Sequence, residues 1–100
     1  MQANNKEGGD LSKVTREFKI INKFGIHARP AAMFAQLASS FDSDIFIEKG
    51  GTRVSAKSIM GLMTLEASFG VKLKITAEGP DAEEAVKQLT KMVESKFDED

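Results

Sequence analysis

The chain has 100 residues, the length of one domain, and its formal net charge of −1 provides no basic field for nucleic acid. It contains no Cys and a single His, which excludes a disulfide framework and argues against a metal site. No apolar run approaches the ~18 residues of a transmembrane helix, and the N-terminus lacks a signal-peptide core. The sequence therefore predicts a cytoplasmic protein that needs no cofactor and does not insert into membranes.

The first part of the chain is predicted to form a tail, a strand and a helix. Residues 1–13 are polar and are expected to be a flexible tail, so the folded domain is expected to span 14–100. Apolar and polar positions alternate over 14–22, which predicts a strand with Phe18 and Ile20 facing the core. A helix is predicted over 30–41, with one apolar face formed by Phe34, Leu37, Ala38 and Phe41.

The middle of the chain is predicted to form two strands and a short helix. Residues 44–49 and 52–57 alternate, and Gly50-Gly51 between them permits the positive φ of a tight hairpin. A helix is predicted over 58–69, with Ser58 as its N-cap and Gly70 as its stop. This helix is apolar almost all round, which indicates either a core helix or a surface that binds partners.

The last part is predicted to form a strand over 71–78 and a helix that begins after Asp81. Glu84 follows Asp81 at the spacing of a capping box. The apolar face of this last helix is predicted to continue to the C-terminus through Ala82, Ala85, Val86, Leu89, Val93 and Phe97. After the helix, Asp98-Glu99-Asp100 is expected to be a solvated end.

The predicted element order is β-α-β-β-α-β-α. Alternation in every strand indicates a sheet with one buried face, which helices must cover. The prediction is therefore a two-layer α+β domain. Order alone also permits a ferredoxin-like double split βαβ fold with an additional helix.

The single histidine, His27, lies just before the first predicted helix. Imidazole is nucleophilic and titrates near neutrality, and a helix start favours an anion. Arg29 adds a planar set of donors suited to phosphate. These residues point to a histidine that accepts a phosphoryl group, with a structural cap histidine as the alternative. The helix cap is either His27 or Arg29, and Pro30 favours the later start because it disfavours helical geometry at the preceding residue.

Two motifs resemble those of HPr, the histidine-containing phosphocarrier of the bacterial phosphoenolpyruvate-dependent phosphotransferase system. The active-site motif of that family is matched by Gly25-Ile26-His27-Ala28-Arg29-Pro30-Ala31. The motif around its regulatory serine is matched by Lys57-Ser58-Ile59-Met60-Gly61-Leu62-Met63. The similarity covers residues 15–97. It implies an open-faced β-sandwich, in which three helices cover one face of a four-stranded antiparallel sheet of order 1-4-2-3.

The resemblance also implies roles for individual residues. His27 would carry the phosphoryl group on Nδ1, Arg29 would neutralise its charge, and the backbone of Ala28 and Arg29 would bind the phosphate. Ser58 matches the residue that HPr kinase/phosphorylase phosphorylates in many members. The residues that would dock partners are Ile59, Met60, Met63 and Ala32.

The chain would then be a phosphoryl carrier and not an enzyme. It would receive the group from Enzyme I and pass it to IIA domains of sugar permeases. HPr kinase/phosphorylase and a transcriptional regulator are further candidate partners, and the chain is expected to be a monomer. A small acylphosphatase-like hydrolase is disfavoured because we find no phosphate-cradling loop with a fitting Asn/Arg pair.

Several residues depart from the pattern of many sugar-branch members: Phe24, Gln36, Ser39, Glu66 and Phe69. Residues 22–27 also resemble nitrogen-branch relatives. A nitrogen-branch or purely regulatory HPr-like protein, which acts mainly by phosphorylation-dependent binding, is therefore the alternative function.

Overall fold

The computed structural model describes residues 12–99. In chain order the elements are β1 (Ser12–Lys19), α1 (Ala28–Ser39), β2 (Asp44–Lys49), β3 (Thr52–Ser55), α2 (Ile59–Thr64), β4 (Lys72–Gly79), α3 (Ala82–Glu94) and the short 3-10 turn η1 (Lys96–Asp98). Of the predicted tail, residues 1–11 lie outside the described residues, while Ser12 and Lys13 belong to β1. None of the helices in residues 12–99 is long and apolar enough to cross a membrane.

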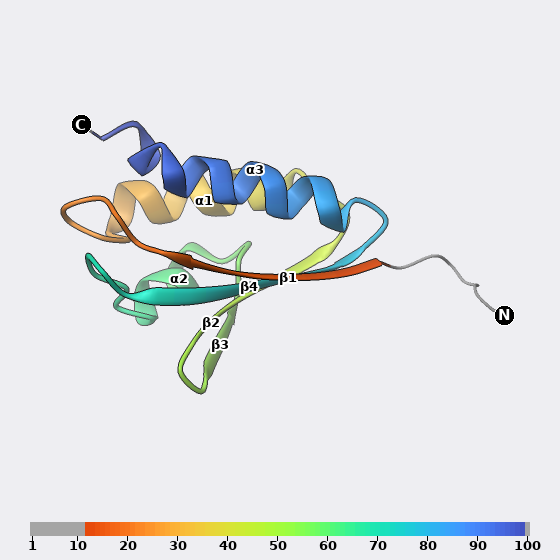
Figure 1. The fold of residues 1–100 in the computed structure, drawn as a ribbon, viewed down its shortest axis with the longest axis horizontal. Helices are drawn as coiled ribbons and strands as arrows, with labels where there is room; N and C mark the ends of the chain where they lie inside the picture. The colour runs from red at the N-terminus through yellow and green to blue at the C-terminus, as the bar shows by residue number, and fades with distance from the viewer. Residues whose placement is uncertain (1–11, 100) are drawn as a thin grey trace, which may run out of the picture.

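The four strands form one antiparallel sheet in the order β1-β4-β2-β3. In β4 the buried residues Leu73, Ile75 and Ala77 alternate with more exposed neighbours, so one face of the sheet needs cover. Helices α1 and α3 lie side by side over that face (Figure 1), and α2 packs against α1 and β3. The predicted two-layer α+β sandwich and its strand order are confirmed.

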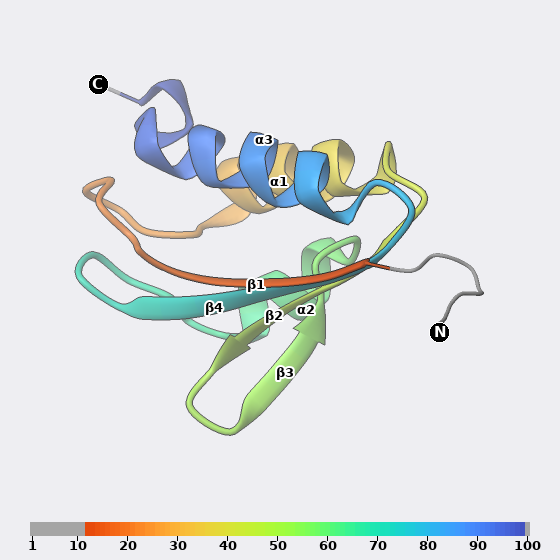
Figure 2. The same ribbon diagram turned by 45° about the vertical axis from the view of Figure 1, so that its right-hand side comes forward.

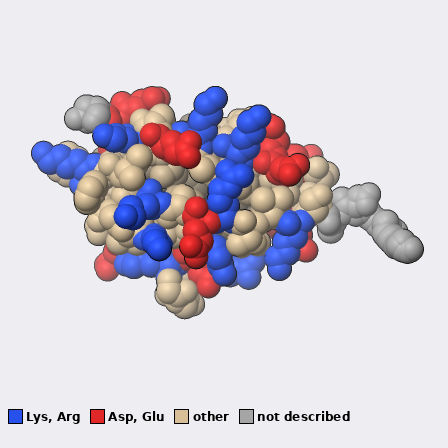
Figure 3. Space-filling model, viewed as in Figure 1, with Lys and Arg blue, Asp and Glu red and all other residues tan. Residues whose placement is uncertain are grey.

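The core fills the space between the sheet and the helices. Its fully buried side chains include residues from β2, β4, α1 and α3, such as Ile45, Ile47, Ile75, Phe34, Val86 and Leu89. Each such side chain stabilises the fold by about 1.5–3 kcal/mol relative to exposure. On the molecular face seen in Figure 3, basic and acidic side chains are interspersed, so no single sign dominates that face.

The strands, α1 and α3 differ from prediction mainly at their ends. Helix α3 ends at Glu94, so the predicted continuation of the helix through Phe97 is wrong. Helix α1 starts at Ala28 and ends at Ser39. Its buried face includes Ala31 and Ala35, whereas Leu37, and Phe41 beyond the helix end, are only partly buried. Ile20, just after β1, is fully buried as predicted, and Phe18 within the strand is partly buried. β1 ends at residue 19 and β3 at residue 55, each earlier than predicted.

Helix α2 is shorter than the sequence predicts. Ser58 is its N-cap as expected, but the helix ends at Thr64 and Gly70 is not its stop. Glu66 takes a φ of 51°, which interrupts the helix. The Nζ atom of Lys49 donates to the carbonyls of Leu65 at 2.9 Å and of Glu66 at 3.3 Å, so a side chain from β2 satisfies the helix end.

The predicted capping box at the start of α3 is wrong. The carboxylate of Asp81 accepts hydrogen bonds from the N–H of Asp42 and from the N–H and hydroxyl of Ser43, and it makes no bond within its own helix. These bonds, led by the Ser43 hydroxyl, lower the pKa of Asp81. Glu84 instead accepts a bond from Gln88. Asp81 therefore ties α3 to the turn before β2.

Candidate functional site

The loop between β1 and α1 is fixed immediately before the histidine. Gly25 has a φ of 68°, and a Cβ there would lie 2.7 Å from the Cα of Ser68 and collide with the carbonyl of Ala67. The N–H of Ile26 donates to this same carbonyl at 2.8 Å. The side-chain amide of Asn22 donates to the carbonyl of Gly25 at 2.8 Å. The close backbone approach leaves no room for a side chain at position 25.

His27 is the N-cap residue of α1. Its φ of −92° and ψ of −167° are extended, and its carbonyl accepts the N–H of Ala31 at 2.9 Å. The favoured later start, with Arg29 as the cap, is therefore wrong. Pro30 lies within the first turn, where its missing N–H has no helical partner to lose, so the earlier start is tolerated. The N–H groups of Ala28 and Arg29 are left at the helix N-terminus next to His27, whose side chain makes no capping hydrogen bond.

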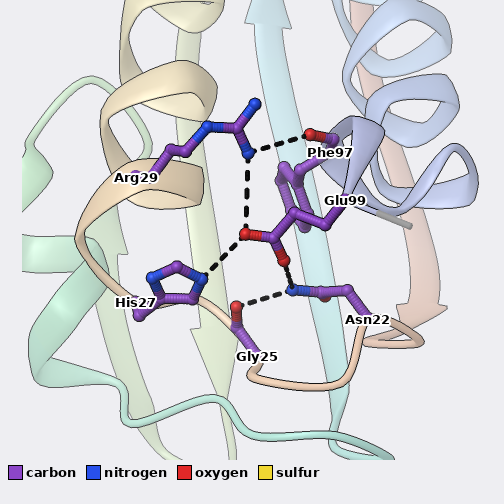
Figure 4. Close-up of polar contacts among 6 residues, drawn as sticks. All are labelled: Asn22, Gly25, His27, Arg29, Phe97 and Glu99. Carbon is purple, nitrogen blue, oxygen red and sulfur yellow. Dashed lines mark hydrogen bonds and ion pairs between the residues drawn. The ribbon is translucent and has the colours of Figure 1, made fainter.

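A carboxylate from the end of the chain meets the histidine (Figure 4). The Nε2 atom of His27 lies 2.9 Å from Oε2 of Glu99. Nη1 of Arg29 lies 3.5 Å from the same oxygen and donates to the carbonyl of Phe97 at 3.2 Å. The other carboxylate oxygen accepts a 2.9 Å bond from the amide of Asn22. The expectation that Glu99 is merely solvated is therefore wrong.

These contacts favour the ionised form of Glu99. The hydrogen bond from Asn22 does most to lower the pKa of the carboxyl, and the bond from His27 and the charges of His27 and Arg29 add to it. Partial burial opposes this shift. The group that faces the histidine is consequently a carboxylate at neutral pH.

The C-terminal segment reaches the site through a left-handed turn after α3. Lys96, Phe97 and Asp98 have φ values of 57°, 55° and 60°. The side chain of Phe97 is fully buried, and its ring centroid lies 6.5 Å from that of Phe34 in α1. Figure 2 shows the end of the chain on the same side of the molecule as the β1–α1 loop. Phe97 therefore anchors the segment that carries Glu99.

The histidine ring remains open to a partner. Its side chain is 42% exposed, and the ring of Phe24 meets it edge-on at 6.2 Å between centroids. An open depression of about 380 Å³ is lined by Lys23, Phe24, His27 and Glu99. Such a surface suits presentation of the ring to a second protein more than enclosure of a small substrate. Among residues 12–99, no group of three His, Asp or Glu side chains could hold a metal ion.

The second predicted motif lies at the start of α2. The Oγ atom of Ser58 accepts the N–H of Gly61 at 2.9 Å, which makes Ser58 a side-chain N-cap. Leu62 points into the core, while Ile59, Met60 and Met63 are exposed. The unusual apolar content of this helix thus divides into one core residue and an exposed set, here called the α2 patch and consisting of Ile59, Met60 and Met63. Ala32, in the neighbouring α1, is half-buried.

A family model described as the PTS HPr component phosphorylation site matches residues 14–95. The chain belongs to the HPr family. Its relatives include phosphocarrier protein HPr of Treponema pallidum, 41% identical over 87 residues, which cover 87% of this chain and 99% of that protein. The HPr-like protein Crh of Bacillus subtilis is 46% identical over 81 residues (81% and 95%), and phosphocarrier protein NPr of Shewanella violacea is 40% identical over 89 residues (89% and 98%).

Solved structures agree with the family assignment. The crystal structure of HPr-C-His from Thermoanaerobacter tengcongensis is 53% identical, with a TM-score of 0.82 over 89% of this chain and 98% of that one. A second structure, described as an HPr dimer from the same organism, is 55% identical, with a TM-score of 0.71 over 82% and 94%. The fold expected from the resemblance is that of HPr, and the family is one of phosphocarriers of the phosphotransferase system.

Proposed function

We propose that this HPr-family chain accepts a phosphoryl group on Nδ1 of His27 from phosphorylated Enzyme I and passes it to IIA domains of sugar permeases. The observation that carries the proposal is the placement of His27. Its ring is exposed, it caps the N-terminus of α1, and Arg29 follows within the same turn. We further propose that the protein works in the cytoplasm as a monomer.

The local electrostatics support a phosphorylated state of His27. The N–H groups of Ala28 and Arg29 and the positive end of the α1 dipole favour an anion beside the ring. The side chain of Arg29 is 54% exposed, so its guanidinium is accessible to a phosphoryl group that a docked partner presents. Because phosphoryl transfer depends on positioning and charge stabilisation, these groups suffice for a carrier without further catalytic residues.

The α2 patch is the proposed docking surface, together with Ala32 of α1. Met60 is the most exposed member at 73%. Methionine adapts its shape to different surfaces, which suits a carrier that must bind both a donor and several acceptors. Helices α1 and α2 pack against each other, so the patch belongs to the same helical layer as the histidine cap.

Ser58 is the proposed regulatory site, a substrate for HPr kinase/phosphorylase. A phosphate there would add about −1.5 to −2 charge at the start of α2. The free N–H groups of this turn would accommodate the phosphate, so no change of fold is required. The added charge would lie beside the α2 patch, where it would weaken the docking of an acidic partner and provide a contact for a transcriptional regulator.

The experiment is incubation with Enzyme I and phosphoenolpyruvate, followed by mass spectrometry of the intact protein. Wild type is expected to gain one acid-labile phosphoryl group, His27→Ala none, and Ser58→Ala the same as wild type. Arg29→Ala is expected to gain the group about 10²-fold more slowly, because removal of one charge-stabilising donor typically has that effect. An unmodified wild-type chain in the presence of a competent Enzyme I would refute the proposal.

A second candidate is a regulatory or nitrogen-branch role. It is favoured by relatives of similar identity that carry the names HPr, Crh and NPr. In a regulatory protein, Ser58→Asp would change the set of bound partners more than His27→Ala does. A nitrogen-branch carrier would be phosphorylated faster by an Enzyme I of that branch than by one of the sugar branch. Binding assays with both variants and kinetics with both donors separate these roles.

A further inference from the structure

The contact between Glu99 and His27 determines which ring nitrogen is free. A carboxylate can only accept hydrogen bonds, so the 2.9 Å contact from Oε2 to Nε2 requires the hydrogen to lie on Nε2. A neutral imidazole carries one ring hydrogen, and Nδ1 is then left with a lone pair. Within the part of the chain that the structure describes, Nδ1 takes part in no hydrogen bond, and Figure 4 shows it on the side of the ring away from Glu99.

On the basis of the proposed phosphoryl transfer, we infer that Glu99 is a positioning residue for it: its carboxylate holds the His27 ring in the Nε2–H tautomer, with Nδ1 as the nucleophile. This role differs from that of Arg29, which meets the phosphoryl group directly. Of the two nitrogens of the His27 ring, Glu99 contacts only Nε2. It acts through the ring, as a buried carboxylate does when it orients a catalytic histidine in other protein folds.

The transfer step then balances without any additional base. The lone pair of Nδ1 attacks the phosphorus, a P–N bond forms, and the P–N bond of the donor phosphohistidine breaks with its electron pair returning to the donor ring. The hydrogen on Nε2 stays in place. The phosphorylated ring of His27 therefore gains positive character, and the carboxylate of Glu99 stabilises it through the same hydrogen bond.

The surrounding residues hold the carboxylate where this role needs it. Asn22, whose side chain is 1% exposed, bridges Glu99 and the carbonyl of Gly25, so the C-terminal segment and the β1–α1 loop are joined by one amide. Phe97 anchors the segment in the core. Arg29 uses Nη1 for both of its contacts with the segment, which leaves its other guanidinium nitrogens for phosphoryl oxygens.

The test compares three variants of the full chain. Glu99→Ala removes the acceptor, and Glu99→Gln keeps an acceptor oxygen but removes the charge. Asp98→Asn is the matched control, because it removes one carboxylate charge from the neighbouring residue, and asparagine accepts its φ of 60°. Nitrogen-15 NMR of the neutral His27 ring reports the tautomer, and rapid-quench kinetics with phosphorylated Enzyme I report the transfer rate.

Wild type and Asp98→Asn are expected to show the Nε2–H tautomer. Glu99→Ala is expected to show a mixture of tautomers and about tenfold slower transfer, the lower end of the roughly 10–100-fold loss that follows removal of a residue that orients a metal-bound histidine. Glu99→Gln is expected to keep most of the tautomer preference and to lose rate through the missing charge. An unchanged tautomer in Glu99→Ala, or an altered tautomer with an unchanged rate, would overturn the inference.

The two proposals fail in different ways. If wild type is not phosphorylated at all, the proposed function is refuted, and the transfer role of Glu99 is refuted with it. If wild type is phosphorylated at the same rate as Glu99→Ala, the proposed function stands and only the role of Glu99 is overturned. The ring spectra need no donor and are read independently of either result.

Discussion

Replacement of Gly25 by alanine tests how tightly the structure fixes the loop before His27. The Cβ would meet the backbone of Ala67 and lie 2.7 Å from the Cα of Ser68, and the φ of 68° is unfavourable for alanine. Gly50 is the matched control, because its φ is 60° and a Cβ added there would have no other atom within 4 Å.

The two glycines separate the conformational cost from the steric cost. A non-glycine residue in the left-handed region costs about 1–2 kcal/mol, which applies to both substitutions. Overpacking against backbone that cannot move adds about 1–3 kcal/mol at position 25 alone. Gly50→Ala is therefore expected to lower the free energy of unfolding by about 1–2 kcal/mol and Gly25→Ala by about 2–5 kcal/mol. Alanine also lowers the conformational entropy of the unfolded chain, and this effect is the same for both substitutions. It therefore cancels in the difference between the two variants.

The free energies of unfolding of the two variants and of wild type are compared by urea unfolding at neutral pH. The comparison requires that the m-value, the slope of the free energy of unfolding against urea concentration, is the same for all three proteins. We also expect Gly25→Ala, and not Gly50→Ala, to perturb the ring resonances of His27, since the displaced loop leads directly into it. Equal losses of stability in the two variants would refute the argument that backbone contact with Ala67 and Ser68 requires glycine at position 25.

Three further predictions concern α2, the start of α3 and the docking surface. Ser58→Ala is expected to lower the free energy of unfolding by about 1 kcal/mol, because the N–H of Gly61 loses its cap, and an unchanged thermal midpoint would contradict this. Ser43→Ala is expected to raise the pKa of Asp81 toward its ordinary value in an NMR titration. The stability that depends on Asp81 is present above the pKa of the unfolded chain and is lost as pH falls through the lower folded pKa, so acid should destabilise wild type more than Ser43→Ala. Met60→Ser is expected to change stability by less than about 0.5 kcal/mol while it weakens binding to Enzyme I in calorimetry, and unchanged binding would remove Met60 from the docking surface.

The sequence predicts most of the fold because its periodicity is clear. Alternation identifies every strand, and the spacing of apolar residues identifies α1 and α3. The end of α2 could not be predicted, because Lys49, a residue in another element, binds the carbonyls of Leu65 and Glu66 just after the last helical residue. The periodicity of the sequence does not predict the order of the strands in the sheet either, and that prediction came from the resemblance to HPr.

The histidine half of the site is local, and the carboxylate half is not. His27 and Arg29 lie in one motif, so their proximity follows from sequence. Glu99 is 72 residues from His27 in the sequence. It reaches the site because Lys96, Phe97 and Asp98 take left-handed conformations, and none of them is a glycine that would indicate such a turn in the sequence. A single phenylalanine in an otherwise polar terminus was the one sign that the chain end folds back onto the core.

The atom that carries the phosphoryl group in the phosphorylated protein decides whether His27 acts through Nδ1. The protein would be labelled with nitrogen-15 in histidine, phosphorylated with Enzyme I and phosphoenolpyruvate, and examined for phosphorus–nitrogen coupling by NMR. We predict one adduct, with phosphorus bonded to Nδ1 of His27 and the hydrogen retained on Nε2. Phosphorus on Nε2 of His27 would contradict the assignment to Nδ1 and the role of Glu99, and phosphorus on any residue other than His27 would contradict the proposed carrier function as well.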